Sequence, residues 1–415
     1  MATCIEQRGR SSWRVSISAG YKDGKQQKIH RSFRFPEEWS TEKQRKEVEK
    51  KAAILYSEFF NKQIAPGRDM LFSEFADLWL KEYAKINLEE KNCYGAQSRL
   101  KGHILPYFGN MRMSKIRTLT ITKFINSLSA WKNPRTGFKL APRTVINYIT
   151  QLSSIFSTAV RWEIISNNPC CRIIKPKVES PDIVIPNETE SVIILKLLEQ
   201  ESIKYQCIVY IGMMTGLRLG EIVGLKWSDI DFQAKQITVV RAMTYVPKIG
   251  NFDKSTKTKT SKRTVTVPVI ILEKLILLQS RQQLDRERLG SKWQENSYLF
   301  ISYDGSPLGH NTPSRWFRRF LLKVRQKQRD TQIAEGISED HIKVIPIIRF
   351  HDLRHFHASI LLAEGVDLET VSRRLGHART STTANIYCHP VMGRDAMASD
   401  TIENVLIKRA YLVNN

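Results

Sequence analysis

"LGHARTSTTANIYCHP" runs from Leu375 to Pro390, and this stretch does most to decide the fold and the chemistry of the chain. His377 follows a glycine, and Tyr387 lies ten residues further on, after a string of small hydroxyl residues. The pattern indicates a short helix, on which Tyr387 is either a packed aromatic or a nucleophile. Because tyrosine needs activation before it attacks, the choice depends on the groups that the rest of the chain supplies.

A segment just upstream supplies three such groups. "FHDLRHFHASILLAEG", from Phe350 to Gly365, places His351 and Arg354 three residues apart on an expected helix. Residues at this spacing share one helix face. His355 adds a third polar side chain before the apolar run begins.

Two earlier segments carry charge at defined spacings. "TGLRLGE" places Arg218 after a glycine at the start of an expected helix, with Glu221 one turn along to pair with it. A structural ion pair explains that spacing equally well. "KTKTSKRTVTVP" gathers basic residues on a turn between strands, namely Lys257, Lys259, Lys262 and Arg263. Such a run is ordinarily a solvated loop.

The composition indicates a polyanionic partner. The chain has 415 residues, and 65 Lys and Arg against 41 Asp and Glu give a formal net charge of +24. Nucleic acid is the commonest partner of so basic a protein. No apolar run reaches the roughly 20 residues that span a bilayer, the first ten residues lack the apolar core of a signal peptide, and the six cysteines form no CxxC pair. We therefore expect a cytoplasmic protein, associated with the bacterial nucleoid.

The first unit expected is residues 1–62. "SWRVSISAGY" and "QKIHRSFRF" alternate as strands on either side of a "KDGK" turn, and "TEKQRKEVEKKAAILYSEFFNK" follows as a helix. A basic face on these strands would suit a DNA groove. Its candidate DNA-binding residues are Arg8, Arg10, Arg14, Lys22, Lys25, Lys28, Arg31 and Arg34.

Two linkers divide the remainder. Residues 63–70 form the first linker, and residues 71–168 follow with amphipathic helical patterns only. Residues 169–187 carry four prolines and no periodicity, which marks the second linker. Residues 188–415 mix helices with a central hairpin-like stretch, "KQITVVRAMTYV" and "KRTVTVPVI". The fold class expected is multidomain α+β.

The ordered set of motifs closely resembles the tyrosine recombinases, the phage integrase family, over nearly the whole chain. The set is Arg218, Lys259, His351, Arg354, His377 and Tyr387. The resemblance implies a three-stranded arm-binding domain with a helix at residues 1–62, an all-α core-binding domain at 71–168 and a mainly helical catalytic domain at 188–415. It further implies four protomers on two DNA duplexes, a Holliday junction intermediate, a small excisionase, a DNA-bending host protein, and docking of the tail from Arg394 to Asn415 on a neighbouring protomer.

The chemistry of a phosphodiester asks for the same residue types. The forked guanidinium groups of Arg218 and Arg354 suit the nonbridging oxygens, and Glu221 would orient Arg218. Tyr387 would attack the phosphate, with His351 as proton acceptor and His377 donating a hydrogen bond. In the family a hairpin lysine protonates the leaving oxygen; we choose Lys259, with Lys257 as the competing residue. Nothing in the sequence indicates a metal site or a cofactor.

Three other functions use similar residues. A type IB topoisomerase shares the chemistry but has no use for residues 1–62, and a dimer-resolving recombinase usually begins with the core-binding helices. A non-catalytic DNA-binding regulator would have no need of Tyr387. We therefore expect an integrase of a phage or an integrative conjugative element.

Overall fold

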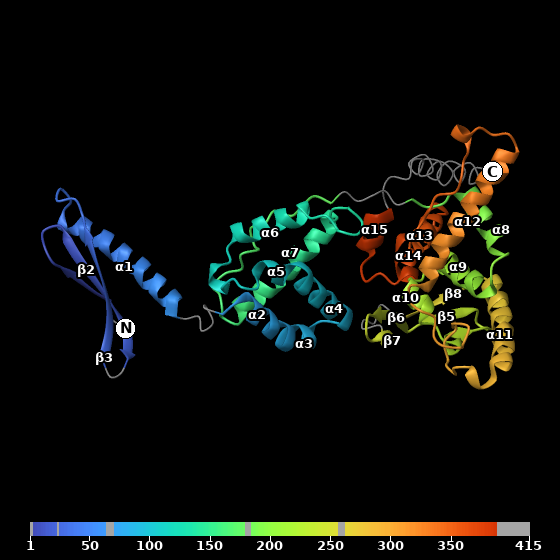
Figure 1. Ribbon diagram of the computed structural model, residues 1–415, viewed down its shortest axis with the longest axis horizontal. Coiled ribbons are helices and arrows are strands. Elements are labelled where there is room, and N and C mark those ends of the chain that lie inside the picture. The colour runs from blue at the N-terminus through green and yellow to red at the C-terminus, as the bar shows by residue number, and fades with distance from the viewer. Residues whose placement is uncertain (1–2, 23–24, 64–69, 179–183, 256–261, 388–415) are drawn as a thin grey trace, which may run out of the picture. The chain divides into compact units, whose positions relative to one another are not determined.

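The computed structural model describes residues 3–22, 25–63, 70–178, 184–255 and 262–387 (Figure 1). The chain divides into two compact units near residue 180. Residues 23–24 of the expected "KDGK" turn, residues 64–69 of the first linker and residues 179–183 of the second lie outside the described residues. So do Lys257, Lys259 and the tail from Arg394. None of the helices in the described ranges combines the length and the apolarity that crossing a membrane requires.

The first unit begins with a three-stranded antiparallel sheet and one helix. The strands are β1 (Thr3–Gln7), β2 (Ser12–Lys22) and β3 (Lys25–Arg34), and α1 (Thr41–Gln63) covers one face. Alternate residues Trp13, Val15 and Ile17 point toward α1 and are buried with Val48 and Ala52. The residue pattern indicates β2, β3 and α1, whereas β1 is implied only by the family resemblance.

The rest of this unit is helical, as expected. Its helices are α2 (Phe72–Trp79), α3 (Lys85–Asn87), α4 (Glu90–Arg99), α5 (Leu105–Phe108), α6 (Thr118–Ala130) and α7 (Pro142–Arg161). π-Helical segments at Leu80–Ala84 and Leu100–Ile104 join α2 to α3 and α4 to α5. These helices pack around a core rich in phenylalanine. Within it, Trp79 Nε1 donates a hydrogen bond to Thr158 Oγ1 at 3.2 Å. This core is separate from that of the N-terminal sheet.

The second unit packs its helices around α9, which is buried on nearly every side. Its helices are α8 (Glu188–Leu198), α9 (Ile203–Thr215), α10 (Leu219–Val223), α11 (Val269–Leu289), α12 (Thr312–Ala334), α13 (Asp352–Ala363), α14 (Leu368–Leu375) and α15 (Thr380–Tyr387). Short 3₁₀ turns stand at Trp227–Asp229, Gly290–Lys292 and Glu339–His341. This arrangement brings α10, α13 and α14, from distant parts of the sequence, around the C-terminal end of α9.

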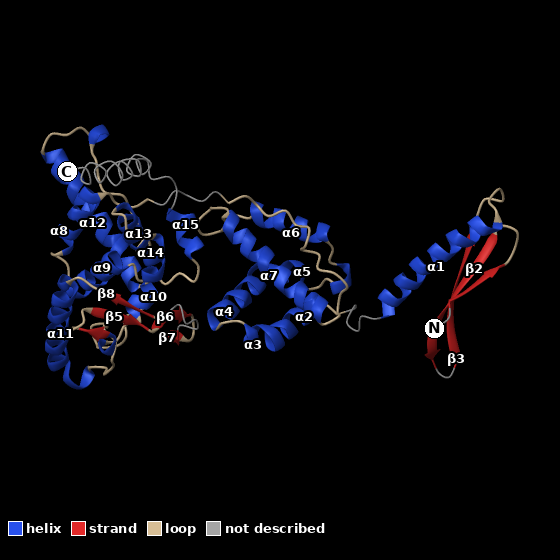
Figure 2. Cartoon of the chain, turned by 180° about the vertical axis from the view of Figure 1, so that it is seen from behind, coloured by secondary structure: helices blue, strands red, loops and turns tan. Residues whose placement is uncertain are grey.

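The strands of the second unit gather beside these helices (Figure 2). β4 (Ile230–Asp231), β5 (Gln236–Val239) and β8 (Arg263–Thr266) form one antiparallel sheet, and β6 (Arg241–Val246) pairs with β7 (Gly250–Ser255). The expected hairpin between residues 235–246 and 262–270 is therefore only half right. β7 has no strand-like alternation; it forms because a tight turn with Gly250 at φ +92° folds it back onto β6. The expected α+β fold class is confirmed.

Candidate active site

Arg218 ends the turn between α9 and α10, and Glu221 lies in the first turn of α10. Gly216 ends α9 in the left-handed conformation, and Arg218 is the N-cap residue of α10. Glu221 is buried, and its carboxylate accepts from Arg218 twice: from the guanidinium Nη1 at 3.0 Å and from the backbone N–H at 2.9 Å. The side chain of Arg218 is 41% exposed, so its guanidinium is held at one edge and reaches solvent at another.

α13 brings Arg354 to the same turn. Arg354 is buried and donates from Nη1 to the Gly216 carbonyl at 2.7 Å. His351 is the N-cap residue of α13, one position before the helix begins, and its ring meets that of His355 edge to face at a centroid distance of 5.3 Å. The two arginines thus approach one site from α10 and α13, although 136 residues separate them in the sequence.

His377 lies in the turn between α14 and α15. Gly376 ends α14 in the left-handed conformation, and Arg218 Nη2 donates to its carbonyl at 3.4 Å. The Nδ1 atom of His377 shares a hydrogen bond of 2.7 Å with Thr383 Oγ1, on α15. Tyr387 is the last residue of α15, one turn after Thr383. The turn therefore joins the Arg218 region to the helix that carries Tyr387.

The histidines of this cluster are held neutral. Burial, with the positive charges of Arg354 and Arg218 beside it, lowers the pKa of His377 to about 4. Burial also lowers the pKa of His351, and the neighbouring His355 and Arg354 add to the effect. At neutral pH His351 is consequently a proton acceptor close to two guanidinium groups. Such a group of cations and neutral imidazoles suits a phosphate anion.

Arg263 is a member of this cluster that sequence reasoning treated only as part of a basic run. It begins β8, and its nearly buried side chain donates to both carboxylate oxygens of Glu221, from Nη1 at 3.1 Å and from Nη2 at 2.8 Å. Its Nε donates to the Arg374 carbonyl at 2.8 Å. A cavity of about 300 Å³ opens beside it, lined by Lys262, Arg373, Gly376 and His377 among others.

A hydrogen-bond network around His357 and Arg374 was also not predicted from the sequence. His357 is buried on α13, and its ring nitrogens lie 3.0 Å from the Met213 carbonyl and 3.1 Å from Arg374 Nε. Since Arg374 can only donate, the Nε2 atom of His357 accepts and its Nδ1–H donates. Arg374 also donates from Nη2 to the Met214 and Thr266 carbonyls. This network ties α9, β8, α13 and α14 together directly under the candidate site.

Some predicted residues are placed incompletely. Lys257 and Lys259 lie outside the described residues, and for Tyr387 only the backbone is described. Among the described residues, no group of three or more His, Cys, Asp or Glu side chains is arranged to hold a metal ion.

The basic residues of the N-terminal sheet do not all share one face. Arg14 and Arg34 alternate with inward-facing neighbours and lie on the face opposite α1. Arg31 pairs in register with Val15, so it lies on the face that α1 covers. It is therefore not part of a basic face shared with Arg14 and Arg34. Arg8 pairs with Glu6 at 2.7 Å on the surface. Arg10 stands in the turn after β1, Lys22 ends β2, and Lys25 and Lys28 lie in β3.

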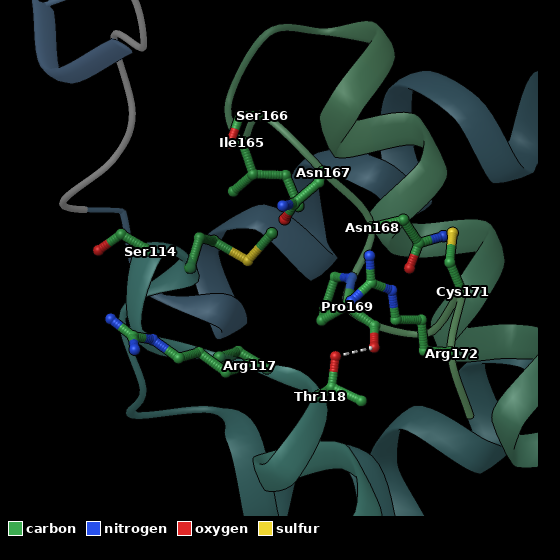
Figure 3. Close-up of a pocket in the computed structure, with 12 residues that line it drawn as sticks. Ser114, Arg117, Thr118, Ile165, Ser166, Asn167, Asn168, Pro169, Cys171 and Arg172 are labelled. Atoms are coloured by element: carbon green, nitrogen blue, oxygen red, sulfur yellow. Dashed lines mark hydrogen bonds between the residues drawn. The ribbon is translucent and has the colours of Figure 1, made fainter. Parts of the chain in front are cut away.

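A cavity of about 510 Å³ in the helical part of the first unit is not a second candidate for this chemistry (Figure 3). It lies at the start of α6, where Thr118 Oγ1 donates to the Pro169 carbonyl at 3.0 Å. Arg117, Asn167 and Arg172 line it, but it holds none of the residues predicted from the motifs.

Comparisons with known proteins agree with the motifs. The family model described as "Phage integrase family" matches residues 187–394, and "Phage integrase, N-terminal SAM-like domain" matches residues 71–129. The ICEBs1 integrase of Bacillus subtilis is 28% identical over 365 residues, 87% of this chain and 90% of the relative. A XerC-like tyrosine recombinase of Caldanaerobacter subterraneus is 25% identical over 96% of this chain and 97% of its own length.

The fold has solved counterparts. The Tn1549 transposon integrase, in a complex with transposon right end DNA, superposes with a TM-score of 0.64 at 16% identity. The match covers 81% of this chain and 99% of that one.

Proposed function

The chain belongs to the phage integrase family and is a site-specific tyrosine recombinase, and we propose that the groups around Glu221 carry its chemistry. The observation that supports this most is the convergence of Arg218, Arg354 and His377 from three elements on one site, with neutral His351 beside them. Guanidinium groups fixed by carboxylate and carbonyl partners are preorganised for the charge that develops on a phosphate in the transition state.

In the proposed reaction Tyr387 Oη attacks the scissile phosphorus while His351 accepts the phenolic proton. The bond from phosphorus to the 5′ oxygen breaks, and Lys259, or Lys257 in its place, protonates that oxygen. A 3′-phosphotyrosyl ester and a free 5′-hydroxyl result. Because the ester conserves the bond energy, a second 5′-hydroxyl can displace Tyr387 without ATP.

The parts of the chain are proposed to divide the work on DNA. Residues 188–415 would perform the chemistry, residues 71–168 would grip the core site, and residues 1–62 would bind arm sites through Arg14, Arg34 and their basic neighbours. Strand exchange would take place in a tetramer through a Holliday junction, in the cytoplasm at the nucleoid. A small excisionase and a DNA-bending host protein would set the direction, and the tail after Arg394 would link protomers.

The integrase function is favoured over a dimer resolvase or a type IB topoisomerase by the N-terminal sheet. Its open face carries Arg14 and Arg34, and its core is separate from that of the helices that follow. A domain of this kind supports binding to a second class of DNA site. A non-catalytic regulator would not require the paired arginines and neutral histidines described above.

The test is covalent attachment to DNA. Incubation with a nicked duplex carrying one end of the mobile element should give a protein–DNA adduct on a denaturing gel. Tyr387→Phe should abolish the adduct and leave site binding nearly intact, because only the nucleophilic oxygen is removed. Tyr303→Phe is the matched control, since Tyr303 is 81% exposed in the same unit. An adduct that persists in Tyr387→Phe would overturn the proposal.

A further inference from the structure

Glu221 accepts four hydrogen bonds, and two of them come from Arg263. Oε1 accepts from Arg218 Nη1 and Arg263 Nη1, and Oε2 accepts from the Arg218 backbone N–H and Arg263 Nη2, all between 2.8 and 3.1 Å. A carboxylate has about four acceptor positions, so Glu221 is saturated. Arg218 can then give the carboxylate only one guanidinium N–H.

We propose that Arg263 is a positioning residue for the recombination reaction: it neutralises Glu221, so that the charge and the outer edge of Arg218 remain for the scissile phosphate. This inference rests on the proposed function. The charge balance carries it, because one buried carboxylate lies between two guanidinium groups, of which Arg263 is 6% exposed and Arg218 is 41% exposed. The buried arginine pairs in the fork-to-fork geometry, and the exposed one does not.

Without Arg263, two acceptor positions of a buried carboxylate would lose their donors. An uncompensated buried charge is costly, and the nearest donor is Arg218. Its guanidinium would turn to pair with Glu221 through two N–H groups, and its charge would then be neutralised at the carboxylate. Arg263 prevents that rotation.

The pKa of Glu221 supports this division of roles. Burial by itself raises the pKa of the carboxyl group, but the hydrogen bonds and charge of Arg263, followed by those of Arg218, hold it below its ordinary value. Arg263 is therefore the stronger of the two partners of Glu221.

Arg263 also fixes the turn that presents His377. Its Nε holds the Arg374 carbonyl, and its guanidinium lies against Gly376 so closely that a Cβ atom there would stand 2.8 Å from Nη1. The same side chain thus sets Arg218 on one side and the His377 turn on the other. A shift of about 1 Å in such groups can cost roughly 100-fold in rate.

The experiment measures single-turnover cleavage of the nicked duplex by the full chain. Arg263→Met should slow adduct formation on the order of 100-fold. The double variant Arg263→Met with Glu221→Gln should cleave at least about tenfold faster than Arg263→Met, because the negative charge that Arg263 neutralised is removed as well. Coupling of this size, roughly tenfold, is usual between residues in contact. Arg263→Lys keeps the positive charge but lacks the forked guanidinium group, so its cleavage rate should lie between those of wild type and Arg263→Met.

A second substrate separates electrostatics from folding. When a methylphosphonate replaces the scissile phosphate, the reacting group is neutral and no longer needs the charge of Arg218. The defect of Arg263→Met relative to wild type should then shrink by roughly tenfold or more. A purely structural defect would be equal on both substrates.

Arg241→Met is the matched control. Arg241 forms a largely buried pair with Asp229 in the same unit, and its described hydrogen bonds go to Asp229 and the Gly224 carbonyl, not to Glu221 or the His377 turn. It should show the same ratio of rates on the two substrates as wild type. The inference is overturned if Arg263→Met cleaves at the wild-type rate, or if the double variant is no faster than Arg263→Met while Arg263→Lys is equally slow. Failure of wild type itself to form an adduct would instead refute the proposed function.

Discussion

Protonation of His357 should weaken the catalytic unit in mild acid. In the neutral ring Nδ1–H donates to the Met213 carbonyl and Nε2 accepts from Arg374 Nε at 3.1 Å. A proton on Nε2 would place two hydrogen-bond donors, Nε2–H of His357 and Nε–H of Arg374, opposite each other. The positive charge of the ring would also repel that of Arg374. Burial, with the charge of Arg374 beside it, lowers the pKa of His357 from 6.5 to about 4.

The size of the effect follows from that difference. The unfolded chain takes up the proton near pH 6.5, whereas the folded chain resists it until about pH 4. The stabilisation is therefore fully present above the unfolded pKa and is lost as the pH falls toward the folded one. The complete interval corresponds to about 3 kcal/mol, of which about 2 kcal/mol is lost between pH 7.5 and pH 5, before most carboxylates titrate.

The perturbation that isolates this group is His357→Gln. Glutamine keeps an acceptor and a donor but does not titrate. Pulse hydrogen exchange in a urea series, read on peptides from α9 and α13, gives the free energy of unfolding of this unit in the full chain. The difference between wild type and His357→Gln should change by about 2 kcal/mol from pH 7.5 to pH 5.

His341→Gln is the control, because His341 is exposed and its ring shares a hydrogen bond of 2.8 Å with nearby Ser338. It should follow the wild-type curve. If wild type and His357→Gln lose the same free energy of unfolding between pH 7.5 and pH 5, then His357 is not held neutral in the folded protein. Its role as the acceptor for Arg374 would be refuted as well.

Three further outcomes are expected. Cleavage should proceed in excess EDTA, since arginine and lysine side chains do the electrostatic work that metal ions do in many nucleases; loss of cleavage that a divalent ion restores would count against the mechanism. A substrate with sulfur at the 5′ bridging position leaves without protonation, so it should rescue Lys259→Ala; rescue of Lys257→Ala alone would show the other lysine to be the acid. Deletion of residues 1–64 should spare core cleavage but abolish protection of distal arm sites and their steep salt dependence; footprinting and a two-site recombination assay at matched salt decide this, and unchanged flanking protection would favour the resolvase alternative.

Helix α1 and strand β2 follow from local patterns because each buries one periodic face. Val48 and Ala52 on α1, and Val15 and Ile17 on β2, are buried as their spacing predicts. β7 could not be predicted in the same way. Its residues "GNFDKS" do not alternate, and it exists because the turn at Gly250 returns it to β6. Pairing imposed by a turn leaves little trace in the composition of the strand.

The site divides along the same line. Arg218 and Glu221 are three residues apart in the sequence, so helix periodicity predicts their contact. Arg263 and Glu221 are 42 residues apart, and their contact requires the pairing of β5 with β8. Yet the sequence holds a signal for Arg263. It stands two residues before Val265 and four before Val267, both buried, so strand alternation assigns it to the inward face. A buried charge at an inward strand position requires a partner, and that requirement distinguishes Arg263 from the residues of a lysine-rich solvated loop. What alternation cannot supply is the identity of the partner, because only the assembled fold places the carboxylate of α10 beneath β8.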